Sequence, residues 1–348
     1  MTLTSALIAV PMAWLTVRTD LPWRRFWSVA TALPLVMPTY VGAMTFVHAL
    51  GPRGLLQKAL EPLGVDRLPE IYGFPGALFT LTLLTYPYLL LSVRTALWGM
   101  DPALEESARA LGHGPWSTFR RVTLPQLRPA LAGGGLLVAL YAMSDFGAVS
   151  LMRFNSFTYV IYSQYQSAFD RTLAAASSLV LVALALSLIL AEATLRGRSR
   201  YYKSTAGTSR RTGPVRLGAW RWPALLLCAT VVSLALVLPL AVLIYLFWQG
   251  VNAGETFQAV GGAMRNSLLA SGLAAIVTVV AAAPVALLSV RYGGRVVGVL
   301  ERAAYTGFAL PGIVVALALV FFGIRYANPL YQTLTMLIAA YAVLFLPV

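Results

Sequence analysis

The stretch that decides the fold runs from residue 106 to residue 125 and reads ESARALGHGPWSTFRRVTLP. It is polar and charged, whereas the flanking segments Phe74–Trp98 and Ala130–Met152 are long and apolar. Apolar runs of about 17 to 25 residues are long enough to cross the ~30 Å hydrocarbon core of a bilayer as helices. The stretch is therefore predicted to be a loop between two membrane spans.

The composition of the whole chain agrees with a membrane protein. Its 348 residues are 59% hydrophobic and 11% charged, with a mean hydropathy of +0.75. A typical soluble domain is about 25% charged. The net charge of +14 does not indicate a nucleic-acid partner, because the cations lie in loops that alternate with apolar runs. We expect an all-α polytopic membrane protein, because a spanning segment must satisfy its own backbone hydrogen bonds.

Nine apolar runs are expected to be membrane helices. Several contain proline, which predicts kinks rather than breaks, for example at Pro38 and Pro87. The nine runs are Leu3–Val17, Ser28–Leu50, Phe74–Trp98, Ala130–Met152, Thr172–Leu195, Trp222–Trp248, Asn266–Val290, Val299–Ile324 and Tyr331–Val348.

The lysines and arginines predict how the chain is oriented. Nineteen of the 26 fall in one alternate set of loops, which includes residues 99–129 and 196–221, and seven fall in the other set. Cytoplasmic loops carry the excess of these residues. The polar loop 99–129 is therefore predicted to be cytoplasmic.

The two parts of the chain resemble each other at an offset of 273 residues. Prolines and arginines occupy the same points of similar apolar runs, which predicts a parallel tandem repeat. We expect a first permease repeat over 1–195, a basic cytoplasmic linker over 196–221 and a second repeat over 222–348. The matched pairs are Pro11 with Pro284, Arg18 with Arg291, and Pro38 with Pro311.

The repeat also predicts segments that the sequence lacks. The first repeat is expected to lack its first span, and the second to be truncated before its own coupling loop. The expectation is a fragment of a longer fused protein with about twelve spans, six in each half. The alternative is a complete protein of nine spans.

Residues 106–125 carry a resemblance to a known family. The order is Glu106-Ser107-Ala108, three residues, Gly112, nine residues, then an aliphatic residue, any residue and Leu-Pro. This resembles the cytoplasmic signature loop of ABC importer permeases, with Ser107 in place of an alanine. The resemblance implies a short coupling helix that docks on a separate ATPase; the alternative is an ordinary amphipathic loop. The candidate coupling residues are Glu105, Glu106, Ser107, Ala108, Arg109, Gly112, Leu124 and Pro125.

Each candidate has an expected contribution. Glu105 and Glu106 near the helix start favour the positive N-terminal end of the helix dipole. Gly112 is expected to end the helix in a left-handed conformation. Leu124 and Pro125 are expected to turn the chain back toward the membrane.

Three further stretches resemble fused two-domain permeases of ferric-iron ABC importers. They are residues 38–43 with 51–56, residues 144–150 and residues 161–171. This resemblance implies the type I importer fold, the bacterial inner membrane as the location and alternating access as the mechanism. It also implies an ABC ATPase dimer, which holds ATP and Mg²⁺, a periplasmic substrate-binding protein and membrane lipid as partners. Fused thiamine permeases share the architecture, and spermidine, sulfate and phosphonate permeases share the signature.

Asp145 is the acid that lies well inside a predicted span, within Ala130–Met152. A charge in the membrane defaults to a functional hypothesis, so Asp145 is a candidate for the translocation path or gate. The alternatives are a structural hydrogen-bond partner for a neighbouring helix and a residue already at the membrane interface. His48 and His113 have no neighbouring metal-ligand residues in the sequence, so no metal site is expected in this chain. We find no catalytic motif, so we expect no enzyme activity. The rival functions are an ion-coupled secondary transporter and an intramembrane enzyme.

Overall fold

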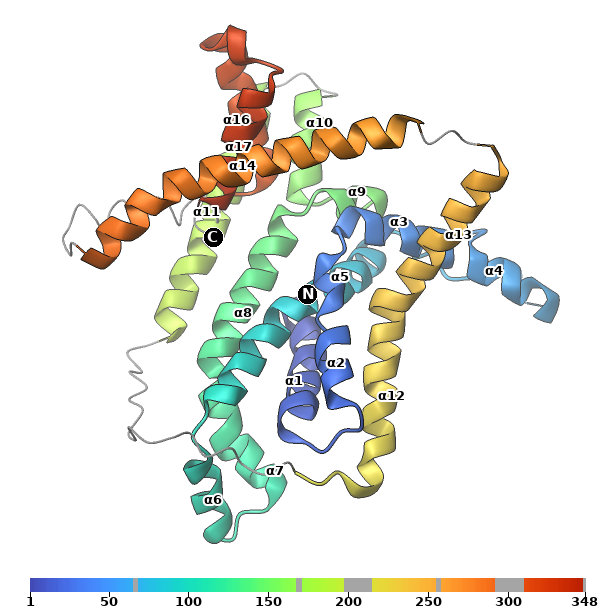
Figure 1. The fold of residues 1–348 in the computed structure, drawn as a ribbon, viewed down its shortest axis with the longest axis vertical. Helices are drawn as coiled ribbons and strands as arrows, with labels where there is room; N and C mark the ends of the chain where they lie inside the picture. Colours follow the sequence, from blue (N-terminus) through green and yellow to red (C-terminus); the bar gives the residue numbers. More distant parts are fainter. Residues whose placement is uncertain (65–67, 167–170, 197–214, 255–257, 292–309, 347–348) are drawn as a thin grey trace. The chain divides into compact units, whose positions relative to one another are not determined.

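The computed structural model describes residues 1–64, 68–166, 171–196, 215–254, 258–291 and 310–346 (Figure 1). Within these ranges every regular element is helical, and Thr19 and Val215 form an isolated β-bridge. The chain folds as two compact units. Unit 1 comprises Met1–Ala142, Gly147–Asn155 and Leu188–Ile244, and unit 2 comprises Met143–Phe146, Ser156–Ser187 and Tyr245–Val348.

Among the described residues the helices run from α1, which begins at Thr2, to α17, which ends at Phe345. Four short elements are 3₁₀-helices (η1, η2, η4 and η6), and η3 and η5 are π-helical segments. In chain order they are α1 Thr2–Arg18, α2 Arg24–Ala30, η1 Leu33–Val36, α3 Thr39–Leu50, α4 Leu55–Leu60, η2 Glu61–Leu63, α5 Phe74–Gly99, α6 Pro102–Ala110, α7 Pro115–Thr118, η3 Phe119–Thr123, α8 Leu124–Ser144, α9 Gly147–Leu151, α10 Phe157–Gln166, α11 Arg171–Arg196, η4 Gly218–Trp220, α12 Arg221–Val232, η5 Ser233–Val237, α13 Leu238–Asn252, α14 Gln258–Arg291, α16 Gly312–Arg325, η6 Asn328–Leu330 and α17 Leu334–Phe345.

Five helical segments in the described residues are long and apolar enough to cross a membrane. They confirm five of the nine predicted runs. Three shorter apolar helices, α1, α16 and α17, of 17, 14 and 12 residues, lie at three other predicted runs and stay predictions as spans. Part of the predicted run Val299–Ile324 lies outside the described residues. The five long segments are Phe74–Gly99, Trp116–Ser144, Thr172–Glu192, Gly218–Asn252 and Val260–Leu288.

The predicted kink at Pro38 is wrong. The segments Arg24–Val36 and Thr39–Leu63 meet at a bend of 98°, so the run Ser28–Leu50 is a broken helix. Pro38 is the N-cap residue of α3 with extended backbone angles. Its ring disfavours helical geometry in the residue before it, which ends the preceding helix. Pro87 lies inside the continuous helix α5, as predicted.

The core of unit 1 is built around α1 and α5, which lie side by side in it (Figure 1). Small residues of α1, such as Ala9 and Ala13, are fully buried there. Small side chains allow two membrane helices to approach closely, so that dispersion contacts and interhelical hydrogen bonds can form. One such bond runs from the hydroxyl of Tyr86 to the carbonyl oxygen of Thr31, at 2.6 Å.

Arg94 also lies in this core, although the sequence places it among the loop cations. Its side chain is 3% exposed near the end of α5. One guanidinium nitrogen donates to the carbonyl oxygen of Ser28 at 2.7 Å, and another donates to the hydroxyl of Thr31 at 3.0 Å. Arg94 therefore fixes the junction between α2 and η1. The cation excess of the predicted cytoplasmic loops persists without it.

Helix boundaries recur at the predicted offset of 273 residues. Both α1 and α14 end at the matched arginines, Arg18 and Arg291. Pro38 and Pro311 are the N-cap residues of α3 and α16, with φ of −57° and −59° and ψ of 133° and 134°. These boundaries agree with a tandem repeat, which stays a prediction.

The predicted linker 196–221 is described only at its ends. Helix α11 ends at Arg196, and residues 197–214 lie outside the described residues. At the other end, the amide of Val215 donates to the carbonyl oxygen of Arg18 at 2.8 Å. The amide of Leu217 donates to a carboxylate oxygen of Asp20 at 2.8 Å. The described end of the linker is therefore fixed to the chain that follows α1.

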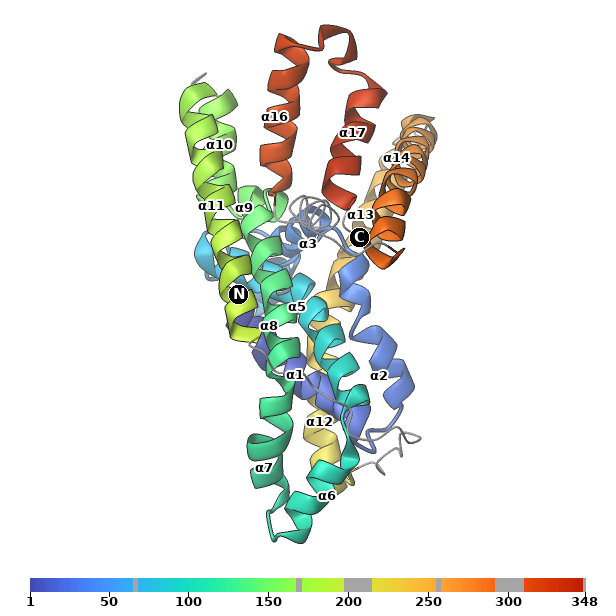
Figure 2. The ribbon, with the colours of Figure 1, turned by 90° about the vertical axis from the view of Figure 1, so that its left-hand side faces the viewer.

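The loops of unit 1 gather at two ends of its helices (Figures 1 and 2). Helices α6 and α7 of the polar loop lie at one end, and α9 lies at the other. At the α9 end, the amide of Gly73 donates to the carbonyl oxygen of Met152 at 2.7 Å, and the guanidinium of Arg153 lies 4.5 Å from the ring centroid of Tyr72. This separation agrees with the predicted division into cytoplasmic and outer loops.

Candidate functional site

The polar loop begins with the short helix α6, whose start and end are set by local sequence. The carboxylate of Asp101 accepts a hydrogen bond from the amide of Ala103 at 2.9 Å, and Pro102 occupies the first turn. This is the usual N-terminal cap, with proline where no amide donor is needed. At the other end Gly112 has a φ of +87°, as predicted for the residue that ends the helix.

Glu105 is turned away from solvent and binds two other elements. One carboxylate oxygen accepts from the guanidinium of Arg18 at 2.8 Å and from the hydroxyl of Thr123 at 2.9 Å. The side chains of Arg18 and Glu105 are 10% and 12% exposed. Glu105 lies in the first turn of α6, as expected for an acid near the positive end of the helix dipole. Its carboxylate also joins α6 to the end of α1 and to the π-helical segment η3.

The neighbouring candidates differ in exposure. Glu106, Ser107 and Arg109 are exposed, so their side chains are available to another protein. Ala108 is 7% exposed, and its carbonyl oxygen accepts from the amide of His113 at 3.1 Å. Ala108 therefore packs against its own loop. The exposed face of α6 carries Glu106, which follows the anchored Glu105 directly in the sequence.

The predicted turn at Leu124 and Pro125 is wrong. These residues lie inside one continuous helix, Trp116–Ser144, which contains the π-helical segment η3, Phe119–Thr123. Proline lacks an amide donor and crowds the preceding turn, and a local change of hydrogen-bond pattern accommodates it. The chain thus passes from the polar loop into the membrane span without a break.

Aromatic contacts form a second link between the loop and α1. The ring of Phe119 lies edge-on to Trp14 of α1, with centroids 6.4 Å apart, and stacks on Trp116 with centroids 5.6 Å apart. Together with the ion pair of Glu105, these contacts attach both sides of the loop to one helix. A displacement of α6 and η3 would therefore act on α1.

Three apolar side chains on this loop were missed in the sequence. Leu104, Leu111 and Trp116 are 51%, 81% and 74% exposed. Large apolar residues in an otherwise polar loop were a signal that could have identified them, since exposed apolar clusters mark interaction surfaces. The pairing of Arg18 with Glu105, which lie 87 positions apart, had no such local signal.

Asp145 does not lie inside a span, contrary to the prediction. Helix α8 ends at Ser144, and Asp145 and Phe146 form the non-helical break before α9. The residue is 8% exposed, and its carbonyl oxygen accepts from the hydroxyl of Thr158 at 2.7 Å. The break places a buried acid beside α10 in unit 2. Its role in a translocation path stays a prediction.

Metal-binding side chains do not gather in the part of the chain that the structure describes. No group of three or more His, Cys, Asp or Glu residues there could hold a metal ion. Of the two histidines, His113 lies 3.4 Å from the hydroxyl of Ser117 through its Nδ1. At the polar loop, an anchored carboxylate lies behind exposed polar and apolar side chains.

Comparisons with known proteins place this chain in a family. Residues 2–200 match the model of the binding-protein-dependent transport system inner membrane component. The Fe(3+)-transport system permease protein FbpB 2 of Haemophilus influenzae is 33% identical over 333 residues, which cover 93% of this chain and 61% of that protein. The molybdenum transport system permease protein ModB of Escherichia coli K12 is 31% identical over 137 residues, 39% of this chain and 58% of that protein.

The matches bear on several expectations at once. The chain spans about three fifths of the length of both relatives, 61% and 58%. Both relatives are named as transport permeases, and the family match covers the described helices α1 to α11 together with the polar loop. The family match agrees with three expectations: helical membrane segments, an inner-membrane location and a transport role rather than an enzymatic one. The chain belongs to the family of binding-protein-dependent transport system inner membrane components.

Proposed function

We propose that this chain is the permease part of an ATP-driven importer for ferric iron, and that the loop formed by residues 99–129 couples it to a cytoplasmic ATPase dimer. A periplasmic binding protein delivers the iron. ATP and Mg²⁺ bind the ATPase, and closure of the ATPase dimer displaces the loop. The helices then alternate between outward-open and inward-open arrangements, and iron passes as cargo.

The observation that carries this proposal is the construction of α6. Its exposed face presents Glu106, Ser107 and Arg109, and the buried Glu105 holds the opposite side to Arg18. A surface that transmits force needs an accessible contact and a firm attachment to the element that moves. The loop has both, because the exposed candidates lie on the same short helix as the ion pair that binds the end of α1.

Iron is proposed as the cargo because the similarity to an iron permease extends over most of this chain. The Haemophilus influenzae Fe(3+) permease matches 93% of this chain, whereas the molybdenum permease matches 39%. Thiamine and other small solutes are the alternative cargoes.

The proposal is tested with the full-length permease, its ATPase and its binding protein in proteoliposomes. ATP hydrolysis is measured with the binding protein empty, loaded with Fe³⁺ or loaded with thiamine. We expect stimulation by the Fe³⁺-loaded form and loss of that stimulation in Glu106→Ala. Stimulation by thiamine alone would replace iron as the cargo, and a permease that binds no ATPase would overturn the coupling role of the loop.

The control for Glu106→Ala is Glu70→Ala. Both residues are exposed acids, and Glu70 lies in the connection before α5, away from the polar loop in the sequence. We expect Glu70→Ala to keep full stimulation. Equal loss in both variants would indicate a general effect of removing a surface acid and would contradict a specific role for Glu106.

A further inference from the structure

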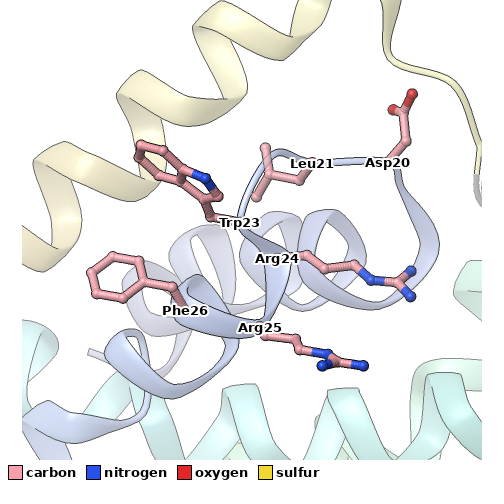
Figure 3. A pocket seen from close by; sticks show the side chains of 6 residues that line it. All are labelled: Asp20, Leu21, Trp23, Arg24, Arg25 and Phe26. Carbon is pink, nitrogen blue, oxygen red and sulfur yellow. The ribbon is translucent and has the colours of Figure 1, made fainter.

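A second surface of unit 1 lies just after α1 and takes no part in the coupling contact proposed above. The connection from α1 to α2 forms an open hollow of about 600 Å³, lined by Asp20, Leu21, Trp23, Arg24, Arg25 and Phe26. Figure 3 shows the rings of Trp23 and Phe26 on one side of this connection and both guanidinium groups on the other. One short segment thus separates an aromatic side from a cationic side.

The segment is held in place by the end of the linker. Thr19 pairs with Val215 in the isolated bridge, and the amide of Asp20 donates to the carbonyl oxygen of Val215 at 3.2 Å. The carboxylate of Asp20 in turn accepts from the amide of Leu217 at 2.8 Å. The one acid that lines the hollow is therefore engaged with the backbone.

The two arginines outnumber the single acid that lines the hollow, so the hollow has a net positive charge. Both Arg24 and Arg25 are exposed, and among the residues that the structure describes neither forms an ion pair with an acid. Guanidinium groups bind phosphate oxygens through paired hydrogen bonds, and they are more weakly hydrated than an ammonium group. A phosphate group is the ligand that two adjacent free guanidinium groups fit best.

The aromatic side chains favour the phosphate of a lipid headgroup over free phosphate. The side chains of Trp23 and Phe26 are 79% and 58% exposed. Trp23 has a φ of +54°, a left-handed conformation that a bulky residue adopts only when its surroundings impose it. Tryptophan is enriched where the bilayer meets water, because its ring enters the headgroup region and its N–H stays hydrated. Free phosphate offers nothing for these rings to contact.

The position of the hollow agrees with that source. It follows Arg18, which binds the polar loop, so it lies at the end of unit 1 that is predicted to be cytoplasmic. Trp220 and Trp222 flank Arg221 at the start of α12, and both indoles are more than two-thirds exposed, at 74% and 67%. The guanidinium of Arg221 lies 5.7 Å from the ring centroid of Trp222. The aromatic and cationic character thus continues onto a second helix.

We propose that the hollow formed by residues 20–26 binds the phosphate headgroup of an anionic phospholipid in the cytoplasmic leaflet. Arg24 and Arg25 bind the phosphate, and Trp23 and Phe26 contact the glycerol and upper acyl region. A lipid held there rests against the connection that joins α1 to the linker. This site is independent of the proposed cargo and of the ATPase.

Native mass spectrometry of the full-length permease in detergent tests the site. The protein is titrated with phosphatidylglycerol and with phosphatidylcholine of identical acyl chains, and the fraction with bound lipid is measured. The wild type is expected to retain phosphatidylglycerol in preference to phosphatidylcholine. Each guanidinium contact with the phosphate is expected to contribute about fivefold, so Arg24→Gln/Arg25→Gln is expected to weaken phosphatidylglycerol binding about 25-fold.

Two matched variants separate this site from general charge. Arg53→Gln/Arg265→Gln removes two exposed arginines elsewhere in the chain and is expected to bind phosphatidylglycerol as the wild type does. Arg24→Lys/Arg25→Lys keeps both charges but loses the paired hydrogen bonds of the guanidinium groups, so its binding is expected to lie between that of the wild type and that of Arg24→Gln/Arg25→Gln. Inorganic phosphate at millimolar concentration is expected to leave the bound lipid in place.

Four results would overturn the proposal. One is equal retention of both lipids by the wild type, and another is equal loss in the Arg53 and Arg24 double variants. The third is a loss of ATPase association in Arg24→Gln/Arg25→Gln with unchanged phosphatidylglycerol binding, which would assign the surface to the ATPase. Displacement of the lipid by inorganic phosphate would likewise reject recognition of the glycerol and acyl region.

Discussion

Breaking the contact between Arg18 and Glu105 should weaken coupling without abolishing ATPase binding. Removing one partner of a buried ion pair costs about 3–5 kcal/mol, whereas exposed pairs contribute about 0–1 kcal/mol. Because these side chains are 10% and 12% exposed and Thr123 adds a hydrogen bond at 2.9 Å, the pair lies nearer the buried limit. We expect Glu105→Ala and Arg18→Ala each to destabilise the loop attachment by about 2–3 kcal/mol.

A double-mutant cycle isolates the contact from the other effects of each substitution. If the two side chains act through each other, the double variant should cost about 1–2 kcal/mol less than the sum of the single variants. The sole cysteine of the chain, Cys228, provides the stability probe, because it is fully buried in the core cluster that contains Met12 and Leu15 of α1. Its rate of reaction with a maleimide reports the opening of this core.

Coupling is measured as iron imported per ATP hydrolysed in proteoliposomes. We expect Glu105→Ala to lower this ratio severalfold while the ATPase stays bound, since the exposed Glu106 is unchanged. Glu106→Ala is the matched comparison and should leave the labelling rate of Cys228 at the wild-type value. If the two single-variant costs add within about 0.3 kcal/mol and the ratio is unchanged, the contact between Arg18 and Glu105 has no part in coupling.

Three further substitutions test the fold around the site. Arg94→Lys loses the planar guanidinium that donates to Ser28 and Thr31 at the α2–η1 junction. We expect about 1–2 kcal/mol of destabilisation and faster labelling of Cys228. Labelling of Cys228 at the wild-type rate would contradict this. Gly76→Ala places a methyl group against the backbone carbonyl of Ile71 and should lower Tm. Gly99→Ala has open space around it and should keep the wild-type Tm. Equal Tm values for the two variants would contradict the predicted clash. Gly112→Ala must hold a φ of +87°, which costs about 1 kcal/mol and should weaken ATPase binding about fivefold. Gly114→Ala is its control, and equal binding by both would contradict the conformational argument.

Much of the helical architecture could be predicted from the sequence, because long apolar runs admit few structures in lipid. The ends of helices with a local signal were also predictable, as at Gly112. Pro38 was a different case, since a proline inside an apolar run signals a disturbance but does not give its size. The bend of 98° depends on how α2 and α3 pack in unit 1.

The contacts between distant segments could not be predicted. Arginine near a helix end usually extends its charge to the interface, and nothing in the sequence indicated that Arg94 turns inward to Ser28 and Thr31. Glu105 and Glu106 look equivalent as neighbours in the sequence. The fold separates them because only Glu105 faces Arg18, and that separation gives the loop an anchored side and an exposed side.

The most direct test of the account is ATP-driven transport by the full-length complex. Proteoliposomes contain the permease and its ATPase, with ATP on the ATPase side and the Fe³⁺-loaded binding protein on the other. We predict iron accumulation that requires ATP and is lost in Glu106→Ala. Accumulation driven by a proton or sodium gradient in the absence of the ATPase would contradict it and establish a secondary transporter.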